Sequence, residues 1–83
     1  MERQIKLYWD FHGPASQKTA EHHKIHLDEF ADREKIPFEV SGVEQRASEA
    51  FSAYIVVPES HMLTLRDALK PRRATVFSGS DQK

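Results

Sequence analysis

A cluster of histidines is the first feature of the sequence that can carry chemistry. His22, His23 and His26 lie within one segment. On a helix, residues four apart lie one turn apart on the same face, so His22 and His26 have a spacing that a zinc ion can bridge, with Glu29 or Asp10 as a third ligand. The HExxH signature of metalloproteases is absent, because His23 stands where that signature has glutamate. We interpret the segment as a solvated helix flank. His22 and His26 are the candidates for a metal site, but no metal or other cofactor is assigned.

A second group of candidate residues lies near the N-terminus. Tyr8, Asp10 and His12 alternate with apolar residues and share one face of a strand. An aspartate beside a histidine can act as a general base, because the carboxylate orients the imidazole. His12 also precedes the first turn of a helix that contains Ser16 and Lys18, and a helix N-terminus attracts anions. Asp10 and His12 are therefore the catalytic candidates, and His12, Ser16 and Lys18 are the candidates for binding an anion. The alternative is an open sheet face with ordinary polar side chains.

Both groups have to be positioned by regular elements, of which the first is a strand over residues 4–11. Large apolar residues occupy every second position of this segment and alternate with polar ones. The apolar face, which must be the core face, consists of Ile5, Leu7, Trp9 and Phe11. Gly13 is placed to cap a following helix and Pro14 to begin it, because the missing N–H of proline costs nothing at the first helical position.

Residues 14–36 form the longest periodic segment and predict a helix. At about 100° per residue, its apolar stripe consists of Ala20, His23, Leu27, Phe30 and Ala31. The helix has to end by Ile36, because the residue before Pro37 is forced out of the α region. The stripe faces the sheet, whereas Ile25 lies on the opposite side.

The remainder of the chain predicts three further strands and a shorter helix. The strands are expected at 38–43, 51–57 and 72–77, and the helix at 58–69. In the first of these strands, Phe38 and Val40 are expected to point inward. The polar segment 44–50 is either a long hairpin loop or part of a hairpin whose strands continue further than the pattern reveals. Residues 78–83 are expected to be a disordered tail after a single domain of residues 1–77.

The resulting element order is β-α-β-β-α-β. Two helices can bury their stripes together only on one face of an antiparallel sheet, and right-handed crossovers leave few arrangements. The sequence therefore predicts an α+β domain with the ferredoxin-like split βαβ sandwich. Its four-stranded sheet has the order 4-1-3-2, with both helices on one face.

This fold hosts many unrelated activities, so it implies no function by itself. Acylphosphatases of this fold use an arginine in the loop after the first strand and an asparagine on the central strands. The segment HGPASQK has no arginine, and the chain has no asparagine. Heavy-metal-transport domains of this fold need a CxxC motif, and the chain has no cysteine. Both activities are therefore excluded.

Composition limits the partners of the chain. The formal net charge is −1 and the pI is near 6.5. The chain lacks the basic excess of proteins that bind phosphate backbones, which argues against nucleic acid. No apolar run reaches the roughly 20 residues of a membrane span, and the N-terminus has no secretory signal pattern. Because the absence of cysteine fits a reducing compartment, we expect a cytoplasmic protein that does not contact a membrane.

The predicted fold leaves one face of the sheet without helices. We expect on that face an apolar and aromatic patch formed by Tyr8, Val43, Tyr54 and Val56. Such patches usually mark association. The leading hypothesis is a non-enzymatic binding module that forms a homodimer through this face or binds another protein. The alternative is a small enzyme, or a sensor of an anion or other small ligand, that uses Asp10 and His12.

A third hypothesis is that single-stranded RNA stacks on Tyr8 and Tyr54. The segment KLYWDF resembles the first-strand motif of RNA-recognition motifs in its aromatic second position, Tyr8. The segment SAYIVV lacks the basic residue and the glycine of their third-strand motif. Asp10 and Glu39 are expected on the same face and would repel phosphate.

Overall fold

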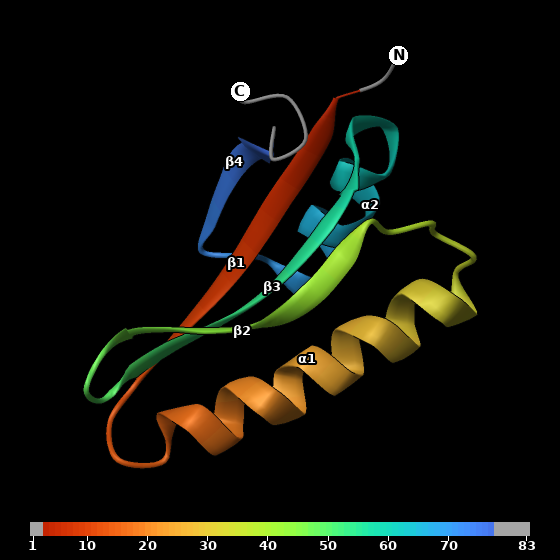
Figure 1. The fold of residues 1–83 in the computed structure, drawn as a ribbon. Coiled ribbons are helices and arrows are strands. Elements are labelled where there is room, and N and C mark those ends of the chain that lie inside the picture. Colours follow the sequence, from red (N-terminus) through yellow and green to blue (C-terminus); the bar gives the residue numbers. More distant parts are fainter. Residues whose placement is uncertain (1–2, 78–83) are drawn as a thin grey trace.

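The computed structural model describes residues 3–77 as a four-stranded antiparallel sheet with two helices on one face (Figure 1). The elements are β1 (Gln4–His12), α1 (Ser16–Arg33), β2 (Val40–Ala47), β3 (Ala50–Pro58), α2 (Glu59–Leu69) and β4 (Arg73–Phe77). The strand order β2-β3-β1-β4 is the predicted order 4-1-3-2 read from the opposite edge. The predicted α+β, ferredoxin-like class is therefore confirmed. The disorder predicted for 78–83 lies outside the described residues.

The core forms where the apolar face of β1 meets the helices. Ile5, Leu7 and Trp9 are all buried, as the alternation along the strand predicts. Across the sheet, Leu7 pairs with Ile55 and Trp9 with Ala53, so two apolar faces continue into one another. Figure 1 shows α1 running alongside β2 and α2 lying behind β1 and β3. The two helices and the sheet thus enclose a single core.

Helix α1 has the predicted stripe but starts later than predicted. Ala20, Leu27 and Ala31 are fully buried, and His23 and Phe30 are partly buried. The expected cap at Gly13 with the helix beginning at Pro14 is wrong, because residues 13–16 first form a turn. Gly13 has a φ of 107°, which L side chains rarely adopt, and its carbonyl accepts a hydrogen bond from the Ser16 N–H at 3.0 Å.

Strand β2 differs most from the prediction. It runs from Val40 to Ala47, so the hairpin strands do continue through the polar segment, with a turn at residues 48–49. Val40 pairs with Val56 on the open face and is 37% exposed, and Phe38 lies before the strand and is 38% exposed. Val43 pairs with Ala53 and packs against the core. The predicted inward positions of Phe38 and Val40 and the outward position of Val43 are therefore wrong.

The reason is that valines occupy both alternating sets of positions in β2. A strand with apolar residues on both faces does not reveal which face is buried. Contacts with other elements decide the register instead. The Ser41 hydroxyl donates to the Asp28 carboxylate on α1 at 2.5 Å, which fixes Ser41 and its neighbour two residues on, Val43, on the helix side.

Gly42 allows an aromatic ring to cross β2. A Cβ atom built at Gly42 would lie 2.7 Å from the Tyr54 Oη and 3.0 Å from its Cζ, closer than real Cβ contacts. The ring of Tyr54 therefore lies over the backbone of β2 at the one position of that strand without a side chain.

The C-terminal third of the chain largely follows the prediction. On α2, Leu65 is buried, and Met62 and Leu69 pack against the core, whereas Ala68 is exposed. Strand β4 begins at Arg73 because the preceding N–H, that of Arg72, already bonds to the Tyr8 carbonyl at 2.8 Å.

Candidate functional site

The face of the sheet opposite the helices holds the predicted catalytic residues, Asp10 and His12, and the tyrosines Tyr8 and Tyr54. The antiparallel register fixes which side chains share this face, because directly paired residues point to the same side. Tyr8 pairs with Tyr54 and Asp10 with Ser52, and Tyr8 pairs with Arg73 on its other side. The molecule measures only 16 Å along its shortest axis. The open face is thus one broad side of a thin slab.

Asp10 is the centre of a polar network that joins all four strands. Its carboxylate accepts two hydrogen bonds from the Arg73 guanidinium, at 3.0 and 3.1 Å, and one from the Ser52 hydroxyl at 2.6 Å. Arg46 on β2 donates to Ser52 at 2.8 Å and lies 3.7 Å from Asp10. Ser52 is fully buried, and the Asp10 side chain is 14% exposed.

This network makes Asp10 unsuitable as a general base. The hydrogen bonds from Arg73, followed by that from Ser52, overcome the effect of burial and lower the pKa of Asp10 from 3.8 to about 2. A catalytic base has its pKa near the operating pH. Both carboxylate oxygens are also occupied by protein donors. The role of this carboxylate is therefore structural: it joins the strands.

Asp10 and His12 lie in the same network but are not joined as a catalytic pair. Within the described chain, the His12 imidazole is bonded to Arg46, whose Nη2 lies 3.3 Å from Nε2 of the ring. A guanidinium can only donate, so this nitrogen of His12 accepts. The predicted Asp–His arrangement is thus replaced by a chain from Asp10 through Ser52 and Arg46 to His12.

The tyrosines of the open face are covered by cations from the same chain. The Arg73 guanidinium lies 3.9 Å from the centre of the Tyr8 ring, and the Lys6 ammonium lies 4.2 Å from that of Tyr54. Lys6 is held there by Glu44 at 3.2 Å. Tyr8 is 9% exposed. These cation–π contacts replace the exposed aromatic patch that the sequence suggested.

Three of the four predicted interface residues do lie on this face. Tyr8, Tyr54 and Val56 are neighbours across β1 and β3, but Val56 is fully buried within the single chain. Val43 lies on the helix side, and Val40 takes its place as the exposed valine of β2. Most of the patch is therefore already covered by long polar side chains.

The predicted anion site at the start of α1 is largely closed. Ser16 is 3% exposed, and the N–H of Gly13 donates to the Glu49 carbonyl at 2.8 Å. Lys18 is exposed on the helix surface. Since two of the groups near the helix N-terminus are buried or bonded within the protein, His12, Ser16 and Lys18 do not form an open cradle.

The two candidate metal ligands lie on the solvent side of α1. His22 and His26 are both exposed. Within residues 3–77, no group of three or more histidine, aspartate or glutamate side chains is arranged to hold a metal ion. The next carboxylate along the helix, Asp28, pairs with Lys24 at 2.8 Å. His23 differs from its neighbours, because its ring lies against the sheet.

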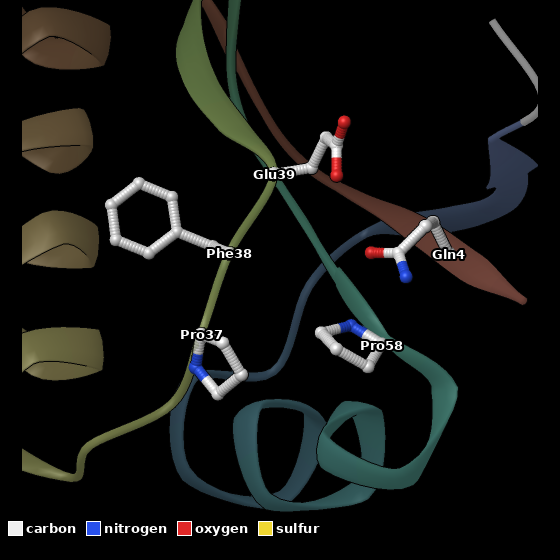
Figure 2. A pocket seen from close by; sticks show the side chains of 5 residues that line it. All are labelled: Gln4, Pro37, Phe38, Glu39 and Pro58. Atoms are coloured by element: carbon white, nitrogen blue, oxygen red, sulfur yellow. The ribbon is translucent and has the colours of Figure 1, made fainter. Parts of the chain in front are cut away.

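Two shallow hollows lie outside the open-face network. The first, of about 230 Å³, is lined by Gln4, Pro37, Phe38, Glu39 and Pro58. Figure 2 shows the ring of Phe38 extending toward α1, with Glu39 and Gln4 on the other side. The second, of about 270 Å³, is lined by His26, Glu29, Phe30, Arg33 and Leu69. Both are below the roughly 300–1,000 Å³ of typical ligand pockets.

A comparison of the chain with models of protein families, with curated proteins and with solved structures finds no match. In the described part of the chain, no helix combines the length and apolar character needed to cross a membrane. The function has to be inferred from the geometry described above.

Sequence reasoning missed the partners that decide the role of Asp10. Arg73 lies 63 positions away in the chain, and Arg46 and Ser52 flank the hairpin turn. Only the register of β2 and β4 against the central strands brings these residues to Asp10. The one local signal was the basic pair Arg72 and Arg73 at the start of a strand. Successive residues of a strand point to opposite faces, so one of the two arginines must lie on the face that carries Tyr8 and Asp10.

Proposed function

We propose that the chain is a non-enzymatic interaction module that forms a homodimer through the open face of its sheet. The observation that carries this proposal is that the charged groups of that face pair with one another inside a single chain. Glu44 pairs with Lys6, and Asp10 pairs with Arg73. Burying charges that are already paired and hydrogen-bonded costs much less than burying isolated ones.

The same pairing disfavours an anionic ligand. Arg46, Arg73 and Lys6 already donate to Ser52, Asp10 and Glu44, respectively. A phosphate would have to compete with these acceptors and would approach two carboxylates. A nucleobase would in turn have to displace Lys6 from Tyr54. A protein surface of matching polarity can bind without displacing Lys6 from Tyr54 and without competing for the arginines.

The size of the face is sufficient for a weak dimer. Each strand residue covers about 16 Å² of sheet, from a rise of about 3.3 Å and a strand spacing of about 4.8 Å. Strands of these lengths give a face of roughly 500 Å² per copy. Two paired faces would bury on the order of 1,000 Å², the lower limit for specific interfaces. We therefore expect dissociation in the micromolar range rather than an obligate dimer.

A second copy is the partner that best matches both signs of charge. A two-fold axis brings the same patch against itself, so the two surfaces have the same polarity and each copy keeps its own ion pairs. Val40, at 37% exposure, lies near Tyr54 at one end of the face and adds apolar surface to be covered.

The test is the solution mass of wild type and of two variants on the open face. Tyr54→Glu and Val40→Glu each place an unpaired charge in the interface, and we expect both to be monomers at concentrations where wild type is a dimer. Ile25→Glu is the matched control, because Ile25 is 50% exposed on the opposite side of the molecule. Circular dichroism establishes that each variant is folded.

The outcomes separate the possible interfaces. A wild type that is monomeric at millimolar concentration ends the proposal. A dimer that Ile25→Glu dissociates and Val40→Glu leaves intact would place the contact on the helix side instead.

A further inference from the structure

His23 is the one partly buried histidine of α1 and is unusual in its surroundings. Its ring centre lies 5.1 Å from that of Trp9 and 5.6 Å from that of Phe11. Its Nε2 atom is buried and has no hydrogen-bond partner. Buried polar atoms without partners are rare in proteins and cost about 1–3 kcal/mol each. Such an atom calls for an explanation in terms of what the residue does.

His23 also brings the first half of α1 into contact with the aromatic rings of β1. In residues 16–24, the fully buried side chains are the small ones of Ser16 and Ala20. The second half is held by Leu27 and Ala31, with Phe30 packed beside them. The N-terminal half therefore contributes little apolar area of its own, and the His23 ring adds to its packing on β1.

The surroundings of His23 do not favour a positive charge. On β1 its neighbours are Trp9 and Phe11, and Asp10 and His12 point to the opposite face of the sheet. The residues of β2 and β3 on the helix side at this end of the sheet are uncharged: Val43, Gln45, Phe51 and Ala53. On α1 itself, His26 lies one turn away and adds repulsion. Burial, and then His26, lower the pKa of His23 below its ordinary value of 6.5.

Aromatic rings can also attract a cation, so the two effects have to be compared. A cation–π contact at a partly exposed site contributes about 0.5–1 kcal/mol. A protonated ring would instead bring a second N–H donor, without an acceptor, into the buried side together with the charge, and an unsatisfied buried donor alone costs about 1–3 kcal/mol. The unfavourable effects are larger, and the neutral ring is the form that fits.

We propose that His23 is a pH-sensitive latch, which holds the N-terminal half of α1 on β1 while its ring is neutral and releases it when the ring is protonated. The released segment is bounded by the turn at Gly13 and by the anchored half that begins at Leu27. Opening of this kind is sub-global, because the sheet and the second half of α1 keep their contacts. It would expose Trp9 and Phe11 in weakly acidic solution.

The direction of the pH effect follows from proton linkage. Because protonation is harder in the folded state, the unfolded chain binds more protons below pH 6.5. The contribution of the latch is therefore complete above pH 6.5 and is lost as the pH falls toward the lower folded-state pKa. Asp10, whose pKa is about 2, titrates well below this window.

Trp9 is the only tryptophan of the chain, so its fluorescence reports directly on the latch. We expect its emission to shift to longer wavelength, and the unfolding constant in urea to rise several-fold, between pH 7.5 and 5. His23→Leu should flatten both changes, since leucine fills similar space and does not titrate. His22→Leu is the matched control on the exposed side of the same helix and should leave both unchanged.

Amide hydrogen exchange and proton NMR complete the test. After correction for the intrinsic pH dependence of amide exchange, protection at pH 5 should fall in residues 17–24 and much less in 28–33. The imidazole of His23 should titrate below the ordinary pKa of 6.5. A His23 titration at or above its ordinary pKa, or a pH dependence that persists in His23→Leu, would refute the latch. If His23→Leu does not fold, the NMR titration and the exchange pattern of wild type decide alone.

Discussion

Asp10 is the residue whose role changes most between the sequence and the structure. Alternation along β1 places it correctly on the open face beside Tyr8 and His12. Its function as a base would require free oxygens and a pKa near neutrality. Arg73 and Ser52 remove both conditions. A carboxylate in such a network stabilises the pairing of the strands and does not act as a base.

Asp10→Asn tests this role. The amide keeps the size of the side chain but has no charge and only one acceptor oxygen for the two bonds of Arg73, so we expect a loss of about 1–3 kcal/mol in unfolding free energy. The folded-state pKa of about 2 lies below the ordinary 3.8, so this stabilisation is complete above pH 3.8 and is lost as the pH falls toward 2. Urea titrations from pH 7 to 2 measure both effects. An Asn variant as stable as wild type at pH 7 would contradict the network's importance.

At the scale of elements, Trp9 connects β1 to the short helix α2. Its ring is 5% exposed, and its Nε1–H donates to the carbonyl of Leu69 at 2.8 Å. Leu69 is the last residue of α2. Otherwise α2 is held mainly by Leu65, its one fully buried side chain. The indole therefore both fills the core and fastens the end of the helix.

Trp9→Ala and Trp9→Phe separate these two contributions. We expect Trp9→Ala to lower the unfolding free energy by about 3–5 kcal/mol, as for other large core residues. Trp9→Phe keeps most of the apolar volume but leaves the Leu69 carbonyl unpaired, so its loss should be about 1–3 kcal/mol. Chemical denaturation followed by circular dichroism gives both values. A Trp9→Phe variant as stable as wild type would assign no importance to the hydrogen bond.

The elements could be predicted where one periodicity dominates the sequence. In β1 every apolar residue of one set is large, and in α1 the stripe runs from Ala20 to Ala31, so both elements and their buried faces were found. In β2 the sequence VSGVEQRA has a valine in each alternating set, and the turn at Ser48 and Glu49 lacks the Asn-Gly or Asp-Gly signal of tight hairpins. The register of β2 depends on tertiary contacts, which a local pattern does not contain.

At the scale of the whole molecule, the arrangement of charges makes a further prediction about the dimer. If the open faces meet with their ion pairs already formed within each chain, association creates few new ion pairs between the two copies. We therefore expect the dimer dissociation constant to change less than about threefold between 50 and 500 mM NaCl, because only unpaired surface charges are strongly screened. Sedimentation equilibrium at the two salt concentrations measures it.

A dissociation constant that rises tenfold or more over this range would show that charges of one copy pair with those of the other. In that case the dimer would still form through this face. Lys6 and Arg73, however, would leave their partners within the chain and pair with the other copy. The variant Glu44→Gln distinguishes the two, because it frees Lys6 without altering the apolar part of the face.

The central position of β1 has a consequence for the synthesis of the protein. This strand leaves the ribosome before the other strands of the sheet, yet its neighbours are β3 and β4, the last of which ends at Phe77. At about 5–20 residues per second, roughly 2–9 s separate the completion of β1 from that of β3. During this interval the apolar side of β1 has only α1 available to cover it. The nascent chain therefore depends on early formation of α1 to cover the apolar side of β1.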